Sequence, residues 1–217
     1  MTRTSATSGS KATLKHDRRQ AIGEVAMTLF RERGVAATRV EDILERADAS
    51  NGSFYHHFGS KLNLAVILYL ETLQRFQGDL LDELERHEGA RDGIESVVRR
   101  YLRWAAENPT AMRYMMHCRE PSVASASEGK EAALNKQFYE QLIRWLQRHI
   151  YAGEIVKLLP EQYYALWIGP AHQLVRSAIN ELDYFAKPDP ESYVRHLQES
   201  EQPLVHAAWQ VLKKRGS

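Results

Sequence analysis

The stretch Ala47–Lys61, "ADASNGSFYHHFGSK", combines many hydrogen-bond donors with aromatic rings. Serine, asparagine, tyrosine, histidine and lysine side chains can donate to phosphate oxygens or base edges, and glycine lets a phosphate approach the backbone closely. Phe54 and Phe58 stand four residues apart, which places both rings on one face of a helix. The stretch therefore predicts a short helix with one face in a small core and the other against DNA.

Two further helices must position that segment. Apolar residues recur at helical spacing from about His16 to Arg33, and Gly34 is expected to end this first helix. Thr38 and Glu41 have the spacing of a capping box at the start of a second helix. After a turn at residues 48–50, Ser50 can cap the third helix, which ends near His57. Two short helices joined by a tight turn and braced by a longer one predict a helix-turn-helix, whose second short helix would enter the major groove.

Helical periodicity continues through the rest of the chain, and no useful length of strand-like alternation occurs, so the sequence predicts an all-α protein. A long helix is expected from Lys61 to about Arg86, and the small polar residues of Glu120–Gly129 predict a loop. Gly169-Pro170 either kinks one helix or splits it in two, and the sequence leaves both possibilities open. The further helices are expected over residues 91–107, 110–119, 130–152, 161–182 and 191–215.

The final two helices carry apolar stripes suited to lengthwise helix packing. Val194, Leu197, Glu201, Leu204, Ala208 and Val211 follow a three-four spacing in the last one. Such a pair commonly forms a helical-bundle interface between subunits, although it could also cover the core of its own subunit. The pattern favours a homodimer.

Charge and composition narrow the class of protein. The chain carries 29 Lys and Arg against 28 Asp and Glu, yet residues 1–62 hold ten basic and seven acidic residues, a net charge of 10 − 7 = +3. Residues 1–62, called the head below, are thus slightly basic, and the remaining residues, called the body, are slightly acidic. This difference is a weak indication of a polyanion partner. The single cysteine, Cys118, fits a reducing cytoplasm. No membrane-spanning run, signal peptide, nucleophile–base arrangement or metal-ligand spacing is present, so we expect neither an enzyme nor a cofactor.

The segments Thr38–Ile43 and Ser50–Lys61, "TRVEDI" and "SNGSFYHHFGSK", resemble the DNA-binding region of the TetR family of bacterial transcriptional regulators. The strong similarity covers about residues 18–65, and the rest is alike only in length and helical layout. The resemblance implies a homodimer, formed through the last two helices, that binds a palindromic operator in double-stranded DNA. It also implies that an unknown small molecule, bound in the body, releases the protein from the operator.

The resemblance assigns roles to individual positions of the head. Those matching Thr38, Ser50, Gly52, Tyr55, His56 and Lys61 typically contact phosphates, and those matching Arg39, Asn51 and Ser53 more often reach base edges. Asp48 departs from the family, which usually has glycine in this turn. Aspartate tolerates the left-handed conformation better than most residues, so we expect the turn to survive, but a carboxylate there should weaken DNA binding modestly.

The body offers side chains for a mostly apolar ligand pocket with a few polar contacts. For each of them, a place in the ordinary core is the simpler alternative. The candidates are Tyr101, Trp104, Met112, Met115, His117, Cys118, Phe138, Trp145 and Arg176.

These observations predict a disordered basic tail over residues 1–15, a DNA-binding domain over 16–62 and a ligand-binding and dimerisation domain over 63–217. The favoured function is a ligand-responsive repressor. The alternative is a small-molecule-binding or interaction module whose DNA-binding head no longer functions.

Overall fold

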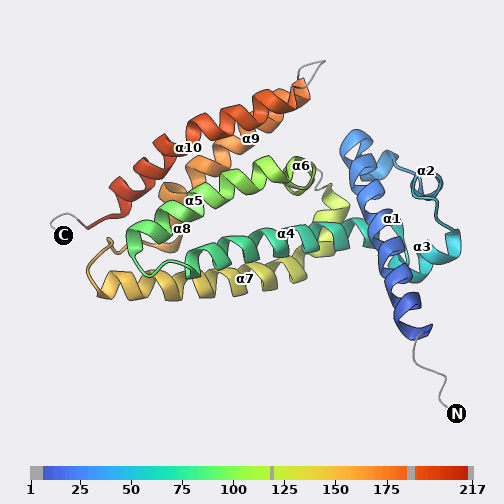
Figure 1. Ribbon diagram of the computed structural model, residues 1–217, viewed down its shortest axis with the longest axis horizontal. Helices are drawn as coiled ribbons and strands as arrows, with labels where there is room; N and C mark the ends of the chain where they lie inside the picture. Colours follow the sequence, from blue (N-terminus) through green and yellow to red (C-terminus); the bar gives the residue numbers. More distant parts are fainter. Residues whose placement is uncertain (1–6, 118–119, 185–188, 215–217) are drawn as a thin grey trace, which may run out of the picture. The chain divides into compact units, whose positions relative to one another are not determined.

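The computed structural model describes residues 7–117, 120–184 and 189–214, and its regular secondary structure is helical apart from one isolated bridge between Ile155 and Lys213. The all-α prediction is therefore confirmed (Figure 1). No helix among the described residues is both long and apolar enough to cross a bilayer. The helices are α1 (Thr7–Ala37), α2 (Val40–Arg46), α3 (Asn51–Phe58), α4 (Lys61–Glu85), α5 (Ala90–Glu107), α6 (Pro109–His117), α7 (Pro121–Tyr151), α8 (Pro160–Tyr163), the π-helical turn η1 (Tyr164–Ile168), α9 (Gly169–Tyr184) and α10 (Pro190–Leu212).

The chain divides into two compact units that do not follow its order. The first unit comprises residues up to Thr72 together with Thr110–Gly129, and the second comprises Leu73–Pro109 together with the residues from Lys130 onward. Helices α4 and α7 each contribute to both units. The first unit is therefore built from two separated stretches of sequence.

The core of the first unit explains why its three short elements hold together. Apolar residues at helical spacing on α1, including Ile22, Ala26 and Phe30, are fully buried. Ile43 of α2 and Phe54 of α3 are also fully buried. The backbone leaves helical geometry at Gly34, whose φ of 82° lies in the left-handed region that glycine adopts without strain. The expected end of the first helical stretch at Gly34 is thus confirmed.

Two expectations for this unit were wrong. Helix α1 begins at Thr7, well before the expected start near His16. The capping box is also absent, because Arg39 is the N-cap of α2 and makes no side-chain cap hydrogen bond. The Thr38 hydroxyl instead donates to the Gly34 carbonyl oxygen at 2.7 Å, so it closes the preceding helix rather than opening the next one.

The loop expected over Glu120–Gly129 is also wrong, because α7 begins at Pro121 and runs through this stretch. Proline is favoured in the first helical turn, where its missing N–H costs nothing, and the alanines that follow favour helix. Val123 and Ser127 are fully buried, so tertiary contacts add to this preference. The polar composition concealed a helix with one buried face.

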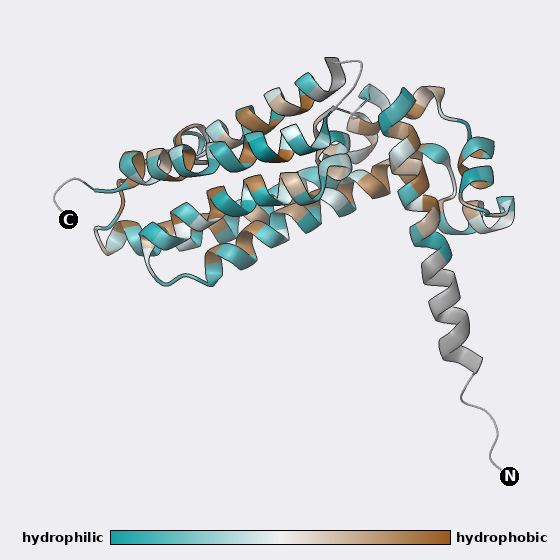
Figure 2. Cartoon of the chain, turned by 45° about the horizontal axis from the view of Figure 1, so that its top comes forward, coloured by the Kyte–Doolittle hydropathy of each residue, from teal (hydrophilic) through white to brown (hydrophobic). Residues whose placement is uncertain are grey.

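In the second unit, α10 packs against α5 and α9, and each helix carries hydrophobic residues on one side and hydrophilic residues on the other (Figure 2). The stripe predicted on α10 is divided between two faces. Leu197 and Ala208 are buried, whereas Val194 and Leu204 are half-buried and Val211 is exposed. Part of the stripe therefore covers the core of this chain, and part remains at the surface.

The Gly169-Pro170 question has an answer that neither alternative anticipated. The backbone widens into the π-helical turn η1 at Tyr164–Ile168 and continues directly into α9 at Gly169. Proline cannot donate a backbone hydrogen bond and its ring crowds the preceding turn, so a widened turn is a natural place for it. A Cβ added to Gly169 would lie 3.0 Å from the Tyr164 carbonyl oxygen, which explains glycine at that position.

Candidate DNA-binding site and ligand-binding region

The helix α3 has one buried and one exposed face, as predicted. Phe54 is 0% and Phe58 2% exposed, with ring centroids 5.7 Å apart, which confirms that both rings are in the core. Tyr55 is 54% exposed, and its ring meets that of Phe54 edge-on at 5.3 Å. The outer face of α3 consists of the exposed Asn51, Gly52, Tyr55 and His56 and the half-buried Ser53.

The N-terminus of α3 has the expected cap. The Ser50 side-chain oxygen accepts a hydrogen bond from the Ser53 backbone N–H at 3.2 Å. The remaining N–H groups of the first turn have no partner within the helix, and the helix dipole places partial positive charge there. This end of α3 thus has the polarity that a phosphate requires.

The turn before α3 contains Asp48, where the resembled family usually has glycine. Asp48 has a φ of 47°, in the left-handed region, and the turn is closed by the Ala49 N–H, which donates to the Leu44 carbonyl oxygen at 2.9 Å. Asp48 therefore preserves the turn, as expected.

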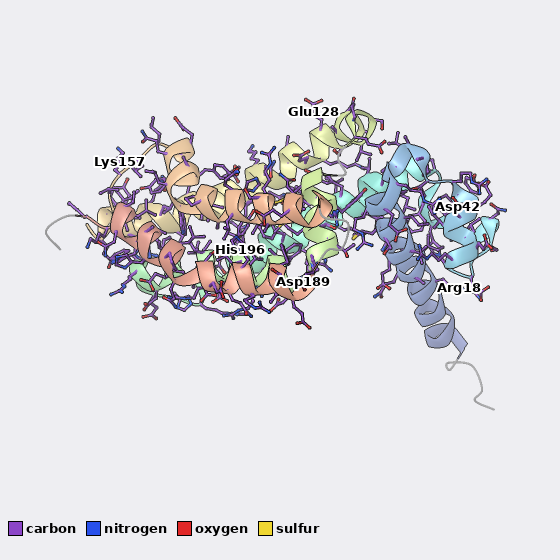
Figure 3. The ribbon with its side chains drawn as sticks, turned by 90° about the horizontal axis from the view of Figure 1, so that it is seen from above. Arg18, Asp42, Glu128, Lys157, Asp189 and His196 are labelled. Carbon is purple, nitrogen blue, oxygen red and sulfur yellow. The ribbon has the colours of Figure 1, made fainter. Side chains whose placement is uncertain are left out.

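At the start of α2, the exposed Arg39 is held by a carboxylate. Its guanidinium donates to Asp42 at 2.7 Å, and Asp42 (labelled in Figure 3) also accepts from Arg33 at 2.9 Å. The hydrogen bond to Asp42 raises the pKa of Arg39, and the same hydrogen bond lowers the pKa of Asp42. Arg39 is exposed and Asp42 is half-buried, so the pair orients Arg39 without adding much stability.

Two predicted phosphate contacts have internal partners in this structure. The Thr38 side chain is fully buried, with its hydroxyl bonded to the Gly34 carbonyl oxygen. The Lys61 ammonium donates to the carbonyl oxygens of Thr38 at 2.6 Å and Ala36 at 3.0 Å. An ammonium has three N–H donors, so two internal bonds leave one for an external acceptor.

The same turn receives a carboxylate that sequence reasoning missed. Glu120 accepts from the backbone N–H groups of Val35 and Ala36, in the latter case at 3.0 Å and 3.1 Å to its two oxygens. The Tyr114 hydroxyl donates to the Ala65 carbonyl oxygen at 2.8 Å. These residues lie some 50 to 85 positions from their partners, and no local pattern marks them.

In the second unit, two predicted ligand residues share an aromatic cluster. The rings of Tyr101 and Trp104 both meet Phe76, at centroid distances of 5.1 Å and 4.9 Å. The Tyr101 hydroxyl lies 2.9 Å from His172 Nδ1. Burial raises the pKa of Tyr101. Burial, followed by the nearby positive charge of Arg176, lowers the pKa of His172, so the neutral imidazole accepts from the hydroxyl.

The other ligand candidates lie in different surroundings. Trp145 is buried beside Trp167 and His149, Phe138 is half-buried, and Arg176 is exposed. Met112, which is fully buried, and Met115, which is half-buried, belong to the first unit. The side chain of His117 and the whole of Cys118 lie outside the described residues. Within the part of the chain that the structure describes, no three His, Cys, Asp or Glu side chains are grouped as metal ligands would be.

Comparison with known proteins agrees with the geometry of the first unit. Residues 22–66 match the TetR_N family model, described as bacterial regulatory proteins of the tetR family. The HTH-type transcriptional repressor KstR2 of Rhodococcus jostii is 44% identical over 66 residues, which is 30% of each chain. The HTH-type transcriptional repressor Rv3405c of Mycobacterium tuberculosis is 38% identical over 85 residues, 38% of this chain and 42% of that protein. The matches thus span less than half the length of these relatives.

The similarity in fold extends over nearly the whole chain. The fatty acid degradation regulator FadR of Bacillus halodurans has a TM-score of 0.73 at 15% identity, covering 91% of this chain and 97% of that one. The transcriptional regulator FadR of Bacillus subtilis, solved in complex with stearoyl-CoA, has a TM-score of 0.67 at 16% identity, covering 87% and 98%. At these identities the likeness concerns the fold alone.

Proposed function

We propose that this chain is a ligand-responsive transcriptional repressor, because residues 22–66 match the family model of bacterial regulatory proteins of the tetR family. In this proposal, residues 16–62 bind a palindromic operator in double-stranded DNA, and residues 63–217 bind a small-molecule effector and form a homodimer through α9 and α10. The site of action is the bacterial cytoplasm. Nothing in the proposal requires a cofactor, a metal or an enzymatic step.

The observation that carries the proposal is the two-faced helix α3. Phe54 and Phe58 anchor it in the core, and this leaves Asn51, Ser53 and Tyr55 on or near a solvent-facing side that can enter a major groove. The capped N-terminus and Lys61 supply positive charge for the backbone phosphates.

In this proposal, one set of residues contacts base edges and another set contacts phosphates and positions the protein on the DNA. Base-edge contacts fall to Arg39, Asn51 and Ser53, and phosphate contacts fall to the remaining positions. Thr38 would contribute through its backbone and its local packing, because its side chain is buried. The other phosphate contacts are Ser50, Gly52, Tyr55, His56 and Lys61.

Release by an effector follows from linkage. In a dimer, the two recognition helices must lie about 34 Å apart to reach successive major grooves. An effector that prefers a body conformation with another spacing lowers operator affinity, and a 100-fold change requires about 3 kcal/mol of differential binding.

The proposal is tested by selecting duplexes from a random pool with the full-length protein and then measuring the affinity of the selected sequence against salt. We expect a palindromic site whose affinity falls steeply with salt, because phosphate contacts release counterions. No enrichment over random competitor would refute the proposal and favour a binding module with an inactive head.

Two substitutions then separate the contact types. Ser53→Ala should change the preferred sequence, whereas Lys61→Ala should weaken all duplexes about equally and reduce the salt slope by about 1. Lys61→Arg serves as the control that keeps the charge. If Lys61→Ala leaves the slope unchanged, the ammonium only supports the turn through Ala36 and Thr38.

A further inference from the structure

Two neighbouring side chains in the second unit each have a buried nitrogen atom without a hydrogen-bond partner. Trp145 and His149 lie one turn apart on α7, with ring centroids 4.1 Å apart, and are only 5% and 3% exposed. The indole Nε1 of Trp145 and the imidazole Nε2 of His149 are both buried without a hydrogen-bond partner. Buried polar groups are nearly always paired, and leaving one unpaired destabilises the folded protein, so two together call for an explanation.

The chemistry of the pair is fixed by its other contacts. His149 Nδ1 lies 2.6 Å from a carboxylate oxygen of Glu154, so this nitrogen carries the hydrogen and donates it. In the neutral ring, Nε2 then has a lone pair and can only accept. The indole Nε1 of Trp145 can only donate. The pair therefore offers one donor and one acceptor on two rings whose centroids are 4.1 Å apart.

The backbone of the residue that carries this carboxylate is itself held in place. The Glu154 N–H donates to the His149 carbonyl oxygen at 3.0 Å, and the Glu154 carbonyl oxygen accepts from the Lys214 N–H at 3.0 Å. The adjacent Ile155 bridges to Lys213. Glu154 is therefore tied to the segment after α10, and this keeps the hydrogen on the imidazole at Nδ1.

The ring of Trp145 is closely packed on the α5 side. A Cβ added to Gly93 would lie 2.3 Å from Cζ2 of Trp145 and 3.3 Å from a methyl carbon of Leu84. Trp167 lies 6.3 Å from Trp145 between ring centroids, and its own N–H is already bonded to the Ile94 carbonyl oxygen. Neither of these neighbours supplies a hydrogen-bond partner for Trp145 Nε1 or His149 Nε2.

We propose that Trp145 and His149 form the polar anchor for a hydroxyl group carried by an otherwise apolar effector. A hydroxyl oxygen accepts from the Trp145 N–H while its O–H donates to His149 Nε2, so one group satisfies both atoms. A methyl group in the same place satisfies neither, and a carboxylate lacks the hydrogen that Nε2 requires. The assignment of the bound compound as the effector rests on the proposed regulatory function.

The test compares phenol with toluene, which differ by a hydroxyl in place of a methyl group, on the full-length ¹⁵N-labelled protein without DNA. Phenol should shift the indole N–H signal of Trp145 saturably and bind at least tenfold more tightly than toluene, since one satisfied hydrogen bond is worth about that much. Trp145→Phe identifies the signal. His149→Phe should remove the preference for phenol, and Trp209→Phe, a substitution on α10, should leave it intact.

A measurement on the unmodified protein tests the chemistry independently of any variant's folding. Long-range ¹H–¹⁵N spectra should show His149 with its hydrogen on Nδ1 and a lone pair on Nε2. Equal affinity for phenol and toluene, no binding of either, or a hydrogen on Nε2 would each overturn the proposal. So would an internal water that stays bonded to the Trp145 N–H in saturating phenol.

The outcomes also separate this site from the regulatory role. None of these measurements involves DNA, so a negative result leaves the repressor proposal intact. A failure to select any duplex would remove that proposal but leave phenol binding unaffected.

Discussion

At the scale of single residues, the head is defined by where its polar side chains find partners. Lys61 and Thr38 bond to the backbone around the turn between α1 and α2, whereas Tyr55 and Asn51 face solvent on α3. This division could not be predicted from the sequence, because the neighbouring residues are the same whether a lysine bonds to two carbonyl groups or is free to bind a phosphate.

Asp48 offers a test of the turn and its charge together. Asp48→Asn keeps a side chain that tolerates the left-handed φ of 47° but removes the negative charge. We expect this variant to bind the selected operator a few-fold more tightly at low salt, with the gain lost as salt screens the charge. Asp48→Ala is the matched control, since it also removes the charge but is strained at positive φ. Electrophoretic or anisotropy titrations across a salt series measure both, and unchanged affinity in Asp48→Asn would show that the carboxylate lies beyond reach of the DNA.

His172 makes stability depend on pH in a definite direction. Its pKa is lowered in the folded protein, so below the ordinary value of about 6.5 the unfolded chain binds more protons than the folded one. The stability associated with the neutral ring is therefore fully present above that value and is lost as the pH falls through the folded pKa.

The prediction for His172 is checked with urea unfolding at pH 7.5 and pH 5.5. The asparagine in His172→Asn can still accept from the Tyr101 hydroxyl but cannot be protonated, so we expect this variant to lose less stability on acidification than the original chain. An equal loss of stability in both proteins would show that other titratable groups cause the loss of stability at acidic pH.

At the scale of elements, the helices were predictable and their ends were not. Periodic apolar residues located the helices, because burial of one face is what stabilises them. The predicted cap at the start of α2 was wrong because the Thr38 hydroxyl bonds to Gly34 in the preceding helix. The predicted loop at Glu120–Gly129 was wrong because burial of Val123 and Ser127 stabilises a helix there despite the polar composition. Contacts between distant segments decided both cases.

The proposed ligand-binding region was predictable only as a set of candidate residue types. The Tyr101–His172 bond joins α5 to α9, and the unpartnered nitrogens of Trp145 and His149 become visible only once α7 is folded against its neighbours. Sequence spacing places Trp145 and His149 on one helix face, but it does not show that Glu154 returns to set the tautomer.

Two glycines in helices give a matched test of packing. Gly93→Ala should destabilise the protein by about 1–3 kcal/mol, because its Cβ would lie 2.3 Å from the Trp145 ring. Gly78→Ala should instead stabilise it by about 0.5–1 kcal/mol, since nothing lies within 4 Å of the added carbon and alanine favours helix. Denaturant unfolding measures both changes, and a neutral Gly93→Ala would mean that α5 and Trp145 can separate at little cost.

At the scale of the whole molecule, exposed apolar residues on the second unit support the proposed dimer. Leu166 is 40% exposed on η1, which continues directly into α9, and Val211 is 45% exposed on α10. Large apolar side chains at the surface are unremarkable singly, but Val211 lies on a helix of the proposed interface and Leu166 lies next to the other one.

Charge introduced at those positions tests the interface. The double change Leu166→Lys and Val211→Lys should raise the dimer dissociation constant at least tenfold, because two unpaired charges per subunit would have to be buried. Tyr151→Lys is the control, since Tyr151 is 88% exposed at the end of α7. Sedimentation velocity over a concentration series gives the dissociation constants, and an unchanged dimer in the double variant would place the interface elsewhere.

The first unit combines an N-terminal stretch with Thr110–Gly129, and Glu120 and Tyr114 of the latter bond directly to the backbone of the former. The N-terminal stretch of the first unit consequently does not carry all of the contacts that hold it together. A chimera that grafts residues 1–72 onto the body of another regulator would leave the amides of Val35 and Ala36 without their acceptor. Specificity could be transplanted faithfully only if both stretches travelled together.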